Sequence, residues 1–170
     1  MTRIRQCTMD DLQMLQQISQ ETFFKAFAHL NSPEDMRRHA EEKYTLDALQ
    51  SELEKEGSRF YFVYEENALA GYMKLNVCPD QSDLHDEESL ELERIYVLPG
   101  FQNKGIGDKL IAHAEDVARA LGKTRLWLGV WEDNTRALHF YERHGLEAFG
   151  AHPYILGDDR QTDILMHKAL

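Results

Sequence analysis

Two closely spaced glycines lie in the segment Gln102-Asn103-Lys104-Gly105-Ile106-Gly107, between a strand-like segment and an amphipathic helical pattern. The first N–H groups of a helix have no partner within it and, together with the helix dipole, bind phosphate groups. Glycine at 105 and 107 lets the backbone approach a ligand without a Cβ atom in the way, and Lys104 and Lys109 can add positive charge. The spacing therefore predicts an anion-binding loop suited to a pyrophosphate.

The spacing also argues against two nucleotide-binding motifs. Walker A requires Lys and then Ser or Thr after its last glycine, whereas Gly107 is followed by Asp108. The dinucleotide fingerprint Gly-x-Gly-x-x-Gly fails because its third glycine position holds Leu110. A strand-to-helix turn without any ligand is the remaining alternative, and it would explain one glycine more easily than two.

A second motif lies downstream, Asn134-x-x-Ala137-x-x-x-Tyr141-x-x-x-Gly145, after a strand that ends near Trp131. Together with the loop and the preceding Ile95-Tyr96-Val97-Leu98-Pro99, it resembles motifs A and B of the GNAT superfamily of N-acetyltransferases. The two motifs cover Leu90 to Gly145, and the flanking strands fit the family's order over nearly the whole chain. The resemblance implies a single N-acetyltransferase domain over residues 1–170, with an acetyl-CoA-binding core at about 90–145.

The resemblance also implies a set of contacts to acetyl-CoA. Backbone groups of Tyr96, Val97 and Leu98 are expected to pair with the pantetheine arm. Residues Gln102 to Asp108 are expected to surround the pyrophosphate, and Asn134 is expected to lie against the cofactor. Tyr141 would lie beside the cofactor thiol.

Amide formation requires a neutral amine and a proton for the leaving thiolate, but no covalent nucleophile. At pH 7 only about one part in a thousand of an alkylamine with a pKa of about 10.4 is neutral, a penalty of roughly 4 kcal/mol. Glu91 and Glu93 are the candidate general bases; the alternatives are a water relay or two carboxylates that are merely solvated or salt-bridged. Tyr141 is the candidate general acid, by direct attack of the amine, and its alternative is a buried aromatic between helix and sheet.

Two features favour a polycationic amine as the acceptor. Seven acidic residues lie between Asp80 and Glu93, and Asn31 to Met36 with Tyr44 and Leu53 resembles the PaiA type of spermidine/spermine acetyltransferases. We therefore predict a small-molecule substrate such as spermidine or spermine. The alternatives are a solvated acidic loop, an acetyltransferase for a protein N-terminus or amino-antibiotic, and a non-catalytic CoA-binding regulator.

The composition limits the remaining partners. Nineteen Lys and Arg against thirty Asp and Glu give a net charge of -11, which disfavours nucleic acid and anionic membranes. No apolar run is long enough for a membrane span, and the N-terminus lacks the apolar core of a secretory signal, so we expect a cytoplasmic protein. No metal site is expected, because neither the histidines nor Cys7 and Cys78 have ligand spacing. The family resemblance suggests a homodimer.

Hydrophobic periodicity and turn signals predict the elements that must position these residues. Strands are predicted at Thr2–Cys7, Arg59–Glu65, Leu69–Val77, Leu90–Val97, Arg125–Val130, Leu146–Ile155 and Thr162–His167. Helices are predicted from Met9, from Ser32, across Leu46 to Leu53, across Leu110 to Leu121 and across Asn134 to Arg143. The pattern predicts an α/β (α+β) fold with seven strands in a mixed sheet and helices on both faces. The GNAT resemblance implies that this seven-stranded sheet is mostly antiparallel. Alternation predicts that Glu91, Glu93, Ile95 and Val97 share one face, and Leu92, Arg94 and Tyr96 the other.

Overall fold

The computed structural model describes all residues from Met1 to Leu170. The elements are β1 (Thr2–Gln6), α1 (Leu12–Phe27), α2 (Pro33–Lys43), α3 (Leu46–Glu54), β2 (Ser58–Glu65), β3 (Ala68–Asn76), β4 (Ser89–Val97), α4 (Ile106–Ala120), β5 (Arg125–Trp131), α5 (Thr135–Arg143), β6 (Glu147–Leu156) and β7 (Asp159–Ala169). This confirms the predicted order, although β7 is longer at both ends than its apolar centre indicated.

The seven strands form one sheet in the order β1-β2-β3-β4-β5-β7-β6. All neighbours are antiparallel except β4 and β5, which confirms the predicted mixed, mostly antiparallel sheet. The parallel pairing is short, running from Ser89 opposite Arg125 to Glu91 opposite Trp127. Beyond this point β4 and β5 are not paired, and the sheet is split in its centre.

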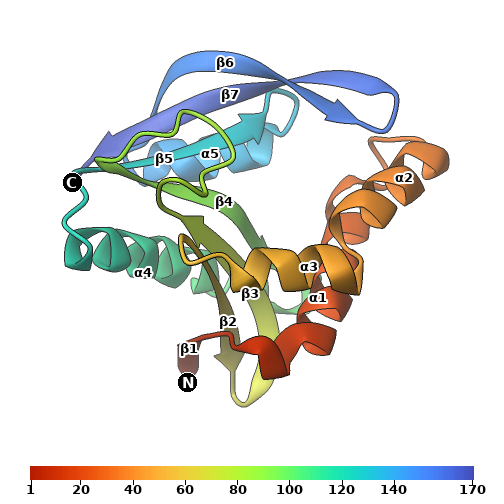
Figure 1. The fold of residues 1–170 in the computed structure, drawn as a ribbon, viewed down its shortest axis with the longest axis horizontal. Helices are drawn as coiled ribbons and strands as arrows, with labels where there is room; N and C mark the ends of the chain where they lie inside the picture. Colours follow the sequence, from red (N-terminus) through yellow and green to blue (C-terminus); the bar gives the residue numbers. More distant parts are fainter.

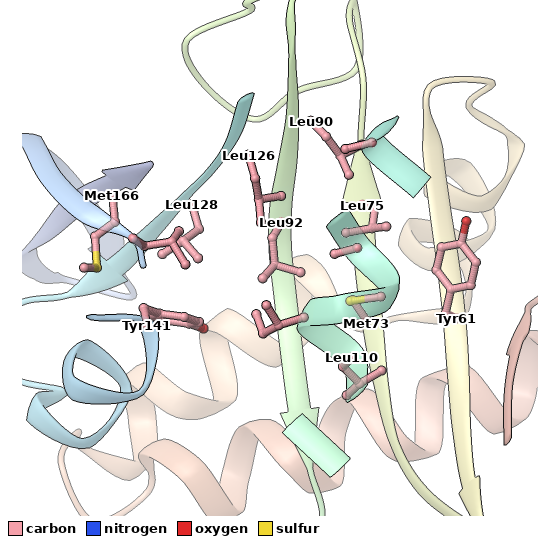
Figure 2. Close-up of a cluster of buried hydrophobic side chains, with 14 of the residues drawn as sticks. Tyr61, Met73, Leu75, Leu90, Leu92, Leu110, Leu126, Leu128, Tyr141 and Met166 are labelled. Atoms are coloured by element: carbon pink, nitrogen blue, oxygen red, sulfur yellow. The ribbon is translucent and has the colours of Figure 1, made fainter. Parts of the chain in front are cut away.

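Helices cover both faces of the sheet, with α4 on one side and α1, α2 and α3 on the other (Figure 1). The core under α4 and α5 contains leucines from β4 and β5, as well as Leu110 of α4 and Tyr141 of α5 (Figure 2). The core under α1 to α3 contains mainly aromatic side chains, including Phe60, Phe62 and Tyr72. The two cores therefore lie on opposite faces of the sheet.

A β-bulge in β4 makes one prediction wrong. Lys74 of β3 pairs with Arg94, but the next residue, Leu75, pairs with Leu92, so Glu93 is an extra residue in β4. An extra residue reverses the alternation of side chains that follow it. Ile95 and Val97 therefore pack in the α4 core beside Leu90 and Leu92, and not on the face of Glu91. Tyr96 and Leu98 pack in the core under α1 to α3.

The β6–β7 hairpin extends over α2 on the face that carries α1 to α3 (Figure 1). At its tip, the N–H group of Asp158 donates to Asp35 Oδ1 at 3.0 Å, and Arg38 pairs with Asp158 at 2.6 Å. α2 itself begins as predicted, because the Ser32 hydroxyl accepts from the N–H group of Asp35 and Pro33 occupies the first turn. The hairpin thus forms one wall over the central split.

Candidate active site

A cleft of about 1460 Å³ lies where β4 and β5 separate. Its lining includes residues from both faces of the sheet, among them Tyr96, Gly105, Gly129, Asn134, Tyr141 and Asp163. The predicted cofactor loop, the predicted acid and both candidate bases thus border a single cavity.

The glycine loop presents a row of free backbone donors to this cleft. The N–H groups of residues 103–108 have no acceptor in the chain, and the first paired amide is that of Lys109, bonded to the carbonyl of Gly105. Asn103 and Gly105 have positive φ values of 62° and 76°, which turn the chain into the first turn of α4. A left-handed residue followed by a helix N-terminus forms a concave anion site. The loop therefore fits a pyrophosphate.

Gln102 ties the loop to both neighbouring elements. Its Nε2 donates to the carbonyl of Val97 at 2.9 Å, and its Oε1 accepts from Arg136 of α5 at 3.2 Å. Arg136 also lines the cleft and adds a positive charge beside the loop. Sequence reasoning missed Arg136, because a single arginine in a helix carries no signal of its own.

Lys109, which sequence reasoning placed near the phosphates, points elsewhere. Its Nζ donates to the hydroxyl of Thr2 on β1 at 2.7 Å. Residues at the start of a helix point in different directions around its axis, so nearness in sequence to the loop does not bring the charge to it. Lys104 Nζ lies over the ring of Phe101 at 5.7 Å.

Asn134 and Asp108 both have partners at helix ends. The side-chain oxygen of Asn134 accepts from the N–H group of Ala137 at 3.2 Å and caps α5. Asp108 Oδ1 lies 2.7 Å from His144 Nε2, which joins the first turn of α4 to the end of α5. Asn134 therefore fixes the start of the helix that carries Tyr141, and it also borders the cleft.

Tyr141 is 9% exposed and its hydroxyl has no hydrogen-bond partner within the chain. Figure 2 shows its ring beside Leu128 and Met166, with the hydroxyl directed toward the strand that carries Leu92. Burial raises the pKa of this hydroxyl, so the phenol keeps its proton at neutral pH. It is a protonated donor at the border of the cleft, with its hydrogen bond unused.

Glu93 is part of a buried ion-pair cluster. It lies 3.0 Å from both Lys74 and Arg94, and those two cations also bind Glu52 of α3 at 2.9 Å. Burial disfavours the charged form of Glu93, but Arg94 and Lys74 outweigh burial and lower its pKa to about 2. A carboxylate held in this way is a weak base, and this geometry favours the salt-bridged alternative for Glu93.

Glu91 is buried and accepts from Asn76 Nδ2 at 2.9 Å and from the N–H group of Ser82 at 2.7 Å. The Ser82 hydroxyl also donates to it. Burial, with the nearby charge of Glu93, raises the pKa of Glu91. Three donors fix this carboxylate between β3 and the loop that precedes β4, so its geometry resembles a structural anchor more than a free base.

Comparison with known proteins identifies the architecture. Residues 12–146 match the acetyltransferase (GNAT) family. The chain belongs to this family. An uncharacterised N-acetyltransferase from the pepI 3′ region of Lactobacillus delbrueckii subsp. lactis is 45% identical over 168 residues, 99% of this chain and 97% of that protein. The protein is thus a GNAT-type, acetyl-CoA-dependent N-acetyltransferase, and the loop at residues 103–108 fits that cofactor.

Two further comparisons, one of sequence and one of structure, are with proteins of Thermoplasma acidophilum. Its spermidine N(1)-acetyltransferase is 25% identical over 169 residues, which cover 97% of this chain and 95% of that enzyme. The crystal structure of the PaiA N-acetyltransferase of this organism, in complex with coenzyme A, has a TM-score of 0.80 at 22% identity, covering 100% of this chain and 99% of that one. The second comparison shows that the fold is shared.

Aromatic rings line the side of the acetyltransferase cleft that faces α1. The ring of Phe27 lies 6.3 Å from that of Tyr96 and 6.5 Å from that of Trp131, and all three are partly exposed. We call these three residues the aromatic wall. They come from α1, β4 and β5, so they meet only because the bulge turns Tyr96 toward α1.

The acidic segment borders the same side of the acetyltransferase cleft, but part of its charge is already paired. Asp80 accepts from the N–H group of Gly57 at 2.9 Å, Asp83 pairs with His152, and Asp86 pairs with Arg125 at 3.2 Å. The anionic field predicted from this segment is therefore weaker than its seven acids indicated. Asp133, after the end of β5, also borders the cleft and has no partner in the chain.

Proposed function

We propose that this acetyltransferase transfers the acetyl group of acetyl-CoA to a primary amine of a polyamine such as spermidine or spermine. The observation that carries this proposal is the acceptor side of the cleft, where the aromatic wall and unpaired carboxylates occur together. Alkylammonium groups bind over aromatic faces and beside carboxylates, and a polyamine carries several such groups along one chain. The spermidine-acetylating relative of Thermoplasma supports the same acceptor class.

For the cofactor, we propose that residues Gln102 to Asp108 surround the pyrophosphate and bind it through the free N–H groups of residues 103–108. The backbone of Tyr96, Val97 and Leu98 would pair with the pantetheine arm along the edge of β4 that β5 leaves open. Asn134 and Tyr141 would border the arm from α5. Acetyl-CoA supplies the acetyl group as an activated thioester, and the protein residues need only orient the reactants and move protons.

Tyr141 is the general acid in this proposal. Its hydroxyl donates a hydrogen bond, and then its proton, to the sulfur atom as the carbon–sulfur bond breaks. The support is its retained proton, its unused hydrogen bond and its position at the cleft. A leaving thiolate without a hydrogen-bond donor would be poorly stabilised in a buried site. A positioned acid removes the negative charge of this thiolate by protonating the sulfur atom.

The loop geometry yields a first prediction. Gly105→Ala should weaken the binding of coenzyme A roughly five- to thirty-fold, because a side chain in the left-handed region costs about 1–2 kcal/mol. The nearest side-chain atom to an added Cβ is 3.9 Å away, so the effect comes from backbone conformation and not from a clash. Isothermal titration calorimetry measures it. Gly100→Ala is the matched control, because a Cβ there meets nothing within 4 Å and its φ is ordinary, and its affinity should not change.

Steady-state release of free thiol from acetyl-CoA tests the proposed acceptor. With spermidine the kcat/KM should be at least about tenfold higher than with 1-aminobutane, since the second and third ammonium groups add contacts of about 1 kcal/mol or more each. Raising the salt concentration should narrow this difference, because it screens exposed charge pairs. Equal values for both amines would argue against polyamines. Thiol release with neither amine, but binding of coenzyme A, would identify a regulator.

A further inference from the structure

One half-buried carboxylate in the cleft, that of Asp163, belongs to neither the ion-pair cluster nor the acidic loop. Asp163 lies on β7, opposite Trp131 of β5 and opposite His152 of β6. A Cβ atom built on Gly129 would lie 3.4 Å from Asp163 Oδ2, so the carboxylate sits directly over this glycine. Gly129 is exposed although β5 is a central strand, because the split between β4 and β5 opens beside it.

Asp163 has no hydrogen bond or salt bridge to any other side chain. Glu91 and Glu93, in contrast, accept from several donors. The protein thus leaves one half-buried carboxylate without a partner, beside the aromatic wall and inside the cavity. An unpaired buried carboxylate is unfavourable for folding, which points to a ligand as its partner.

The position of Asp163 relative to the proposed acid is also informative. Asp163 is on the face of β7 that looks toward α1 and α2, whereas its neighbour Ile164 packs in the α4 core with Tyr141. The two groups therefore approach the split from opposite faces of the sheet. An amine entering along the aromatic wall would have a base on its own side and an acid on the far side.

We propose that Asp163 is the general base that deprotonates the acceptor amine, an inference that rests on the proposed amine acetylation. Asp163 Oδ2 takes one N–H proton from the ammonium group, and the freed lone pair forms the bond to the acetyl carbon. The carbon–sulfur bond breaks and the sulfur takes the proton of Tyr141. The second N–H proton leaves as the amide forms and restores the Tyr141 hydroxyl, while Asp163 releases its proton to water.

Burial raises the pKa of Asp163 to about 6, closer to neutrality than any ordinary carboxyl. Among the titratable neighbours on β6, His152 is paired with Asp83, and Tyr154 has a raised pKa to which burial contributes most and Asp163 in part. On β5 the adjacent residues, Gly129 and Trp131, do not titrate. The carboxylate is therefore charged at pH 7 and a stronger base than one with a pKa near 4.

The first test is the pH dependence of kcat/KM for spermidine in Asp163→Asn. The wild-type value should fall as the pH drops through about 6, because protonated Asp163 cannot accept a proton. The alkylamines remain protonated across this pH range, so this acidic limb of the kcat/KM profile reports the titration of a group on the enzyme. The variant should lose this limb and about tenfold or more of kcat at pH 8. Asp159→Asn, the same change on the same strand but outside the cleft, should keep the limb.

A second acceptor separates a base from a binding residue. An amine with a pKa near 7 is already about half neutral at neutral pH and needs little help from a base. The loss of kcat in Asp163→Asn should therefore be at least about tenfold smaller with such an amine than with spermidine. An equal deficit with both amines, carried by KM, would make Asp163 a substrate-binding group and overturn the proposal. A pH limb that disappears in Glu91→Gln, but persists in Asp163→Asn, would overturn it as well.

Thermal unfolding provides a readout that does not need catalysis. A carboxyl group whose pKa is raised in the folded state destabilises the folded protein as the pH rises from the group's unfolded-state pKa through about 6. Asp163→Asn should therefore raise Tm at pH 8 and change it little at pH 4, whereas a lower Tm at pH 8 would mean that Asp163 has a structural partner.

The failure of this inference can be distinguished from the failure of the proposed function. If the wild-type protein acetylates no amine, the proposed function fails. If the wild-type protein acetylates an amine and Asp163→Asn has the same activity, only this inference fails.

Discussion

Replacing Tyr141 with phenylalanine should lower kcat about 10²-fold or more and leave the affinity for acetyl-CoA nearly unchanged, the usual effect of removing a general acid. The substitution removes one oxygen atom from a side chain that otherwise packs against Leu128 and Met166. That oxygen has no partner within the chain, so its loss leaves no buried group unpaired. The variant should fold normally, and any deficit would come from the reaction itself.

Tyr61→Phe is the matched control for Tyr141→Phe. Tyr61 lies in the same apolar core, far along the sheet from Tyr141 in Figure 2, and outside the cleft. Thiol-release kinetics should give wild-type kcat for this control. If Tyr141→Phe kept the wild-type kcat, or if it lost activity only through KM, Tyr141 would be a packing residue and not the acid.

The largest effect on stability is expected at Arg94. Arg94→Met should lower the free energy of unfolding by about 3–5 kcal/mol, because removing one partner of a buried ion pair leaves a buried charge uncompensated. Arg94 is 8% exposed and binds both oxygens of Glu52, at 2.9 and 3.0 Å, as well as Glu93. Urea unfolding measures the change. Arg119→Met, at a site that is 54% exposed, should change stability by no more than about 0.5 kcal/mol.

The pH dependence of Arg94→Met checks the electrostatic cause. The folded-state pKa of Glu93 is lowered to about 2, so its contribution is present above the unfolded value and is lost as the pH falls toward 2. Without Arg94 this pKa should rise, and the gap between variant and wild type should narrow between about pH 5 and pH 3. Glu93→Gln in the Arg94→Met background should recover part of the loss. If the difference in free energy of unfolding stayed constant with pH and Glu93→Gln recovered none of the loss, the effect would come from lost packing.

Much of the fold could be predicted from local signals. Ser32 and Pro33 predicted the start of α2, and the apolar stripe after the glycine loop predicted α4. The glycine loop itself follows from local chemistry as well, because positive φ at Gly105 and a helix start at Ile106 are properties of neighbouring residues. Elements set by short-range propensity and capping are those that a single sequence specifies best.

The features that depend on pairing between distant strands could not be predicted. The bulge at Glu93 is defined by the register of β4 against β3, and strand alternation alone gave the wrong faces for Ile95 and Val97. The split beside Gly129 depends on how soon β4 and β5 part. Asp163 gave no signal in the sequence beyond a lone acid before an apolar run, because its importance comes from lacking a partner in three dimensions.

A competition assay tests the central claim, acetyl transfer to a polyamine, most directly. The protein is incubated with limiting acetyl-CoA and equal concentrations of spermidine, an aminoglycoside and a peptide with a free N-terminus, and mass spectrometry quantifies the acetylated products. Under these conditions the product ratio equals the ratio of the kcat/KM values. The proposed function predicts that acetylspermidine is the major product. Acetylation mainly of the peptide or the aminoglycoside would contradict it.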